Sequence, residues 1–221
     1  MTEMRQAMSD NPLAALRRFT RERERVPDEL CNFCSAGLFG AHQHLIEPEM
    51  RALICVCEAC AILFGNRGET KYRRVPLCAL SLSDFRLSDA QWQSLHIPIQ
   101  LAFIFHNSAA QKFIALYPSP AGPIESWLES AAWAEIVALN PVLHKMEPDV
   151  EALLINRMKR PGGKDEHEYY LAPIDECFRL TGLLRTHWRG LSGGAKVWEE
   201  ITHFFLELKK RANVSEEESR A

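Results

Sequence analysis

Five of the seven cysteines in this chain fall within one short stretch, from Cys31 to Cys60. Four of them form two Cys-x-x-Cys pairs, Cys31 with Cys34 and Cys57 with Cys60, and residues 35–56 separate the pairs. Two pairs at such a spacing are typical of a tetrahedral thiolate site that holds a metal ion. A segment of about 50 residues buries too little apolar surface to fold alone, so a bound metal must stabilise it. The sequence therefore predicts a metal-binding module near the N-terminus, with these four cysteines as its ligands.

The metal module is one of four parts that we expect in the chain. With 221 residues, the chain can build one substantial core beside a small module. Residues 1–26 contain a helical arm in which arginines alternate with glutamates, and residues 27–75 form the four-cysteine metal module. Residues 76–212 form an α+β domain, and the polar residues 213–221 form a disordered tail.

The segment between the two cysteine pairs predicts a β-hairpin. Residues 42–47 and 53–57 have strand-like patterns and flank the polar turn at 48–51. Cys60 then begins a helical run that ends at Gly65. A cysteine knuckle, a hairpin and a second cysteine pair leading into a helix is the order of a treble-clef zinc module. A zinc ribbon, which has a second hairpin in place of that helix, is the near alternative.

Three further side chains that can bind metal, those of His42, His44 and Cys55, lie in this hairpin. Side chains alternate between the two faces of a strand, so His42 shares a face with His44, and Cys55 with Cys57. With a two- or four-residue turn both sets face the same way, where a histidine could replace a thiolate or the three could form a second site. We favour a supporting role, in which a histidine hydrogen-bonds to a thiolate and Cys55 is a small core residue.

The ligand set does not identify the metal. Four thiolates suit Zn²⁺, and they suit a single rubredoxin-type iron equally well. Zinc is our first expectation because structural four-thiolate zinc sites are common in small modules. Such a site has no open coordination position, so we expect no catalytic residue in it. The two cysteines outside the cluster, Cys78 and Cys177, are predicted to be core thiols.

The residues after the module predict an α+β domain in which helices pack on a mixed β-sheet. Four apolar runs are typical of buried strands: residues 101–106, 113–117, 150–156 and 168–172. We expect the proline-rich residues 118–123 to break the strand before them, and a helix to cover 125–139. A final helix is predicted from a continuous apolar face made of Val197, Trp198, Ile201, Phe204, Phe205 and Leu208.

A second group of candidate binding residues precedes the final helix. Arg185 and Arg189 are at i and i+4, so on a helix they project from one side, and Gly193 and Gly194 lie at the expected start of the final helix. Free backbone N–H groups there, together with two guanidinium groups, could bind a small anion. The alternative is a glycine-terminated helix followed by a tight turn, with the arginines paired to acids such as Asp175.

Composition excludes two classes of function. The formal net charge of -3 and the pI near 6.3 give no overall basic field, so we do not expect nucleic-acid binding. No apolar run reaches the roughly 18 residues of a membrane span, and the N-terminus lacks the apolar stretch of a signal peptide. We therefore expect a cytoplasmic protein whose cysteines are metal ligands and buried thiols rather than disulfides.

Several segments give the chain a resemblance to a known family: the two cysteine pairs with His-x-His between them, YPSPAG, EPDVEALLINR and APIDECFRLTGLLRTHWRGLSGGAKVWEEITHFF. From about Cys31 to Leu208 the chain resembles a bacterial domain-of-unknown-function family whose genes tend to lie beside those of oxygen-tolerant nickel-iron uptake hydrogenases. The resemblance implies a protein partner, a hydrogenase subunit or a maturation factor, and it implies no catalytic residue.

Three functions stay open at this stage. The first is a non-catalytic zinc-binding accessory protein, associated with nickel-iron hydrogenase assembly or function, whose metal module is a rigid contact surface. The second is a rubredoxin-like electron-transfer protein with iron in the four-cysteine site. The third is an enzyme or sensor that binds a small anion at the turn between Arg185 and Gly194.

Overall fold

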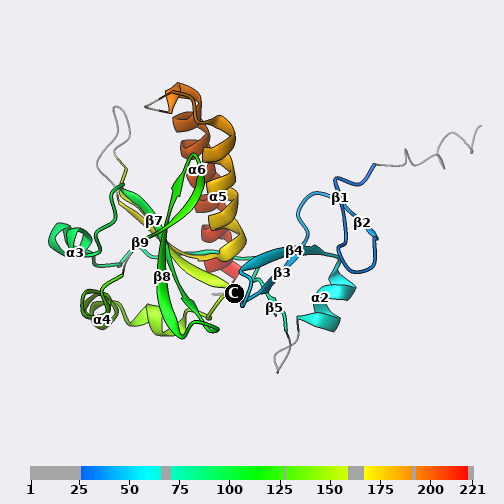
Figure 1. The fold of residues 1–221 in the computed structure, drawn as a ribbon, viewed down its shortest axis with the longest axis horizontal. Helices are drawn as coiled ribbons and strands as arrows, with labels where there is room; N and C mark the ends of the chain where they lie inside the picture. Colours follow the sequence, from blue (N-terminus) through cyan, green and yellow to red (C-terminus); the bar gives the residue numbers. More distant parts are fainter. Residues whose placement is uncertain (1–25, 66–70, 127, 159–166, 191–192, 219–221) are drawn as a thin grey trace, which may run out of the picture.

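The computed structural model describes residues 26–65, 71–126, 128–158, 167–190 and 193–218. The predicted N-terminal arm lies outside these residues apart from Val26, and so does most of the loop between residues 156 and 168. Figure 1 shows a small module at the N-terminal end of this region, next to a larger sheet with helices packed on it. The chain is therefore an α+β protein with its cysteine-rich part set beside the main sheet.

The main sheet has six strands, and every neighbouring pair is antiparallel. Its strands are β6 (Leu80–Ser81), β7 (Leu101–Asn107), β8 (Lys112–Ser119), β9 (Gly122–Ser126), β10 (Glu151–Asn156) and β11 (Glu168–Pro173). The order across the sheet is β6-β11-β10-β7-β8-β9. Both predicted strand pairs are present, but the predicted mixed sheet is wrong. Short connections such as the one between β7 and β8 can join only antiparallel neighbours.

Helices cover both faces of this sheet. They are α3 (Asp89–Ser94), α4 (Ser130–Leu139), the 3-10 helix η1 (Pro141–Lys145), α5 (Ile174–His187) and α6 (Gly194–Glu218). Phe103 and Phe105 of β7 share one core cluster with apolar residues of α5 and α6. Their neighbour Ile104 belongs to a second cluster with residues of α3, α4 and η1. The alternation of side chains along β7 thus separates two cores on opposite faces.

The proline-rich segment at 118–123 does not break the strand, so that prediction is wrong. β8 continues to Ser119, and the chain turns and returns as β9 with Pro118 opposite Pro123. β9 is the edge strand of the sheet, a position where the missing N–H of proline is tolerated. The helix predicted over 125–139 consequently begins only at Ser130.

The final helix is present, with two differences from the prediction. Trp198 is 41% exposed and lies at the margin of the apolar face, where its ring approaches that of Trp188. α6 continues to Glu218, so residues 213–218 are helical although we predicted a disordered tail. No glycine or proline interrupts the sequence there, and glutamate is a good helix former. The other predicted face residues are buried: Val197, Ile201, Phe204, Phe205 and Leu208.

The N-terminal module contains the elements β1 (Glu29–Leu30), β2 (Gly37–Leu38), β3 (Gln43–Glu47), β4 (Ala52–Val56), α2 (Glu58–Phe64) and β5 (Arg73–Arg74). β1 and β2 form a short ribbon, and β4-β3-β5 form a three-stranded sheet. The predicted hairpin is β3–β4, with residues 48–51 as its turn. The predicted helix ends at Gly65, its C-cap, as expected, but it begins at Glu58 with Cys57 as N-cap, two residues before the predicted start at Cys60.

The module packs against the main sheet through β3. Ile46 is 2% exposed and belongs to the core cluster of α5 and α6, whereas its neighbour Leu45 belongs to the module's own core. Arg73 of β5 also donates to Asp149, which is 1% exposed and precedes β10, over 3.0 Å. The predicted boundary between residues 75 and 76 therefore lies within a region where the two parts share a core.

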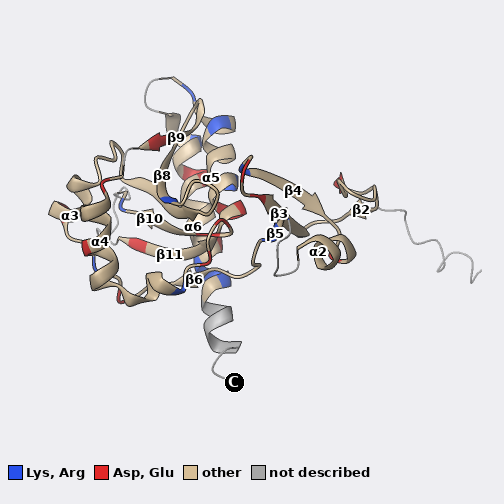
Figure 2. Cartoon of the chain, turned by 60° about the horizontal axis from the view of Figure 1, so that its bottom comes forward, with Lys and Arg blue, Asp and Glu red and all other residues tan. Residues whose placement is uncertain are grey.

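Charged residues are interspersed over both parts in the view of Figure 2, in keeping with the small net charge. Among the helices described, none combines the length with the apolarity that crossing a membrane requires.

Candidate metal centre

Each cysteine pair lies at a turn that brings its two thiols together. The first pair lies between β1 and β2, where the N–H of Ser35 donates to the carbonyl of Cys31 over 2.8 Å. Ser35 closes this turn in a left-handed conformation, with φ of 60°. The second pair begins α2, with Cys57 as N-cap and Cys60 in the first turn.

The four thiols form one compact cluster. Their Sγ atoms all lie within 4.8 Å of one another, and those of Cys34 and Cys57 are 3.7 Å apart. A tetrahedral zinc ion with Zn–S bonds of about 2.3 Å would hold its sulfurs about 3.8 Å apart. A disulfide would need about 2.05 Å. The predicted ligands Cys31, Cys34, Cys57 and Cys60 are thus brought together at a spacing that suits a metal ion.

The pKa values of two of the four thiols shift in opposite directions. Burial raises the pKa of Cys31, but backbone N–H groups of Cys57, Cys34 and Phe33 outweigh burial and lower it to about 6. Burial and the neighbouring cysteines raise the pKa of Cys60 to about 12. Once one thiolate has formed, further deprotonation is therefore opposed. A divalent cation at the centre removes this opposition and allows four thiolates.

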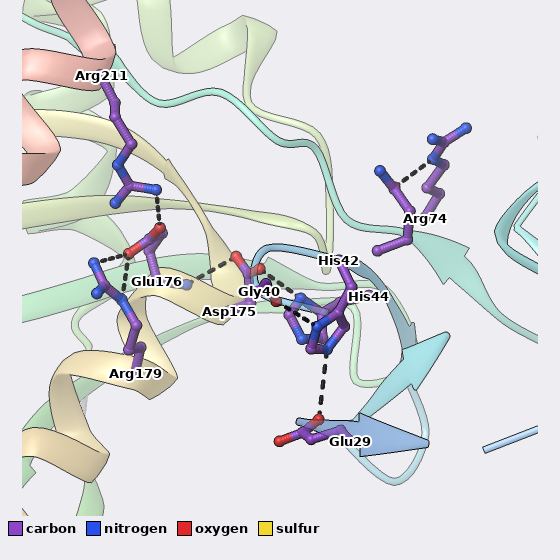
Figure 3. A network of polar contacts seen from close by, with 10 residues as sticks. Glu29, Gly40, His42, His44, Arg74, Asp175, Glu176, Arg179 and Arg211 are labelled. Carbon is purple, nitrogen blue, oxygen red and sulfur yellow. Dashed lines mark hydrogen bonds and ion pairs between the residues drawn. The ribbon is translucent and has the colours of Figure 1, made fainter. Parts of the chain in front are cut away.

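A second group of metal-binding side chains lies on the same hairpin. His44 and Cys55 are directly opposite each other in the β3–β4 register, so the shared face predicted for His42, His44 and Cys55 is present. One possible ligand atom from each of the three lies within 4.8 Å of the others. The two imidazole rings lie side by side, with centroids 4.7 Å apart (Figure 3).

The two histidines do not form the hydrogen bond to a thiolate of the four-cysteine site that we expected; their Nδ1 atoms have other partners. His44 donates from Nδ1 to Asp175 Oδ2 over 2.8 Å, and His42 donates from Nδ1 to the carbonyl oxygen of Gly40 over 3.0 Å. Burial, and then the carboxylates of Glu29 and Asp175, raise the pKa of Cys55 to about 12. Cys55 is only partly buried; it packs against the edge of the module core, as expected of a small core residue, and also lies beside the two histidines.

The two remaining cysteines differ from each other. Cys177 is completely buried on α5, as predicted for a core thiol. Cys78 is exposed, and its assignment to the core is wrong. It lies in the connection between β5 and β6, and such connections run over the surface.

The candidate anion-binding residues have local structural roles. α5 ends at His187, so Arg189 does not share a helix with Arg185. The Arg189 guanidinium donates to the carbonyls of Thr186 and Trp188, and its backbone N–H donates to the carbonyl of Gly193. These contacts agree with the tight turn that we expected as the alternative to an anion-binding site.

Gly193 and Gly194 both have positive φ, of 86° and 76°. A Cβ at Gly193 would come within 2.8 Å of Val197, so this turn requires glycine. The acids expected to pair with the arginines have other partners, because Asp175 binds His44 and Glu176 binds Arg179. The glycines thus serve the turn between α5 and α6.

Two members of the histidine cluster were not recognised from the sequence. Asp175 lies 131 positions from His44, and Glu29 reaches the cluster from β1. Asp175 had been considered only as a partner for arginine. No local pattern connects either acid with the hairpin, and only the tertiary arrangement places Asp175, in the first turn of α5, beside His44.

Comparison with known proteins gives a family but no activity. The model of a family described as "Family of unknown function (DUF5947)" matches residues 30–212. The match includes both cysteine pairs, the histidine cluster except Glu29, and most of the main domain. No curated protein and no solved structure matches the chain.

Proposed function

We propose that this chain, which belongs to that family of unknown function, is a non-catalytic accessory protein whose N-terminal module folds around a zinc ion and binds a protein partner. The observation that carries the proposal is the convergence of four Sγ atoms within 4.8 Å of one another, two of them 3.7 Å apart. A metal that is held by four thiolates has no coordination position for substrate or water. Zinc in such a site contributes folding free energy to the module.

The order of elements supports a treble-clef arrangement for the module. The β1–β2 ribbon carries the first cysteine pair, the β3–β4 hairpin follows, and α2 carries the second pair. A zinc ribbon would have a hairpin in the place of α2. The helix also brings apolar side chains to the module surface.

Exposed apolar side chains of the module support a role in protein binding. α2 directs Cys60 and Ala61 into the core, while Ile62 and Leu63 are 50% and 70% exposed. Near the first cysteine pair, Leu30 is 58% exposed. Exposed apolar side chains that adjoin one another on a helix, as Ile62 and Leu63 do, are candidate contacts for a partner. The partner class, a hydrogenase subunit or maturation factor in the cytoplasm, comes from the sequence resemblance.

Metal analysis and absorption spectroscopy of the purified full-length chain test the metal assignment. We expect a colourless protein that contains zinc and loses it on Cys57→Ser substitution. A red protein with iron and thiolate-to-iron absorption bands would instead favour the electron-transfer function, because four thiolates bind either metal.

Affinity purification from a hydrogen-oxidising host tests the partner. We expect the wild-type chain to recover a hydrogenase component and Leu63→Asp to lose it. Leu206→Asp is the matched control, since Leu206 is 45% exposed on α6, far from the module in sequence. The proposal fails if the wild type recovers no hydrogenase component, or if both variants recover it equally.

A further inference from the structure

We infer that His42, His44 and Cys55 form a second site for a divalent transition metal ion, separate from the four-thiolate site. The four-thiolate module does not need this site, so the inference goes beyond the proposed function. Its first support is that three side chains with metal-binding atoms converge within 4.8 Å on one face of a rigid hairpin.

The hydrogen bonds of the two histidines define which ring nitrogen is left to bind a metal. A carboxylate and a backbone carbonyl can only accept, so His44 Nδ1 and His42 Nδ1 must both carry protons. The Nε2 atom of each ring is then the one with a lone pair. Histidines that bind metals are usually held in this way, with the other ring nitrogen donating to a carboxylate or a carbonyl.

The Nε2 atom of His42 has neither a hydrogen-bond donor nor a cation next to it among the described residues. It is buried, has no hydrogen-bond partner, and lies 3.5 Å from the Glu29 carboxylate. In the neutral ring its lone pair faces the oxygen lone pairs of Glu29, and that contact is unfavourable without a cation between them. A proton could satisfy this one pair of atoms. A metal ion would bind the two imidazoles and the Cys55 sulfur together.

The donor set selects the class of metal. The Glu29 carboxylate lies beside the cluster, 3.5 Å from His42 Nε2. Two imidazoles and one thiolate suit zinc and similar ions, whereas calcium and magnesium require oxygen ligands. The two carboxylates of Glu29 and Asp175 also give the cluster the negative charge that a divalent ion needs.

Asp175 is a positioning residue for this site. Its Oδ1 accepts from the N–H of Glu176 over 2.8 Å, and its Oδ2 accepts from His44, so both carboxylate oxygens are used (Figure 3). Asp175 belongs to the first turn of α5, whereas the ligands belong to the module. A metal here would therefore fasten the module to the main domain.

Zinc stoichiometry of the full-length chain tests the second site. Each protein is loaded with excess Zn²⁺ and freed of unbound metal, and zinc per chain is measured by elemental analysis and native mass spectrometry. We expect two zinc ions in the wild type and one in Cys55→Ser. The single variants His42→Ala and His44→Ala should each retain one zinc ion as well. Agreement among the three variants would show that the loss of zinc in Cys55→Ser does not come from a folding defect of that variant alone. Cys78→Ser, which alters an exposed cysteine outside both clusters, should retain two.

The affinity of the weaker zinc ion tests the role of Asp175. Asp175→Asn should lower the affinity for the more weakly bound zinc ion by about 10- to 100-fold and leave the affinity for the other ion unchanged. The hydrogen-bond partner of a metal-binding histidine orients the ring and raises its basicity. The inference is overturned if the wild type binds one zinc, or if Cys55→Ser binds two. A wild-type chain with one zinc that is lost in Cys57→Ser and kept in Cys55→Ser would remove the second site and leave the proposed function intact.

Discussion

Two adjacent residues of β3 provide a direct test of how the metal module is joined to the main domain. Leu45 and Ile46 are both almost fully buried, at 0% and 2% exposure, but they point to opposite faces of the strand. Leu45 packs in the core that contains Cys31 and Cys60, and Ile46 packs in the core beneath α5 and α6. Ile46→Ala should therefore destabilise the main domain, although the residue belongs to the module.

The expected cost follows from the burial of Ile46. Truncation to alanine removes three buried carbon atoms, worth about 0.8 kcal/mol each, or about 2.4 kcal/mol by transfer alone. The cavity that remains brings the total to about 2–5 kcal/mol. Leu45→Ala removes the same number of carbon atoms from the module core. Its main effect should be faster loss of the metal to a chelator.

The tryptophans make the two parts separately observable. All five lie outside residues 27–75, so tryptophan fluorescence during urea unfolding reports on the main domain. Metal transfer to a coloured chelator reports on the module. Ile46→Ala should lower the urea midpoint of the fluorescence transition and leave the metal-transfer rate close to that of the wild type.

An unchanged fluorescence transition in Ile46→Ala would refute this reasoning. It would mean that the module is an independent domain and that the contact of Ile46 with the main core contributes no stability. A loss of metal in Ile46→Ala as fast as in Leu45→Ala would show that the two faces of β3 are not energetically separable.

Further substitutions test other features of the structure. Cys57→Ser, or removal of the metal by a chelator, should unfold the module, and proteolysis within residues 27–75 should accelerate; unchanged resistance would mean that the metal is dispensable. Asp149→Ala should lower the free energy of unfolding, measured with urea, by about 2–4 kcal/mol. The substitution leaves the Ser108 N–H without its partner and puts alanine at a φ of 67°. Asp149→Asn should cost less than half as much, since asparagine keeps an acceptor and tolerates this φ; equal costs would contradict the role of the hydrogen bond. Arg189→Ala should lower thermal stability by about 1 kcal/mol through loss of its bond to the Thr186 carbonyl, without changing phosphate binding; weakened phosphate binding would restore the anion site.

The regular elements were predicted well where local patterns dominate. The strand pairs β7–β8 and β10–β11 and the buried face of α6 follow from apolar runs and periodicity in the sequence. The segment at 118–123 was misjudged because prolines usually end strands. Its position at the edge of the sheet, which makes prolines acceptable, is a tertiary property.

The same distinction separates the two groups of residues that could bind a metal ion. The four cysteines occur in pairs, and each pair needs only one local turn to bring its thiols together. Two pairs then need only one hairpin between them. His42, His44 and Cys55 were recognised as neighbours for the same reason, from the strand period alone.

What the sequence by itself determined is the composition of a four-cysteine cluster that could hold a metal ion, because its cysteines lie at turns of the local chain. Only the tertiary structure decided what surrounds that site. The arrangement of the module beside the main domain brings Asp175 of α5 to His44 of β3, and the placement of Ile46 in the main core joins the module to the sheet. Contacts across more than a hundred residues depend on how whole elements pack, and no short sequence pattern encodes them.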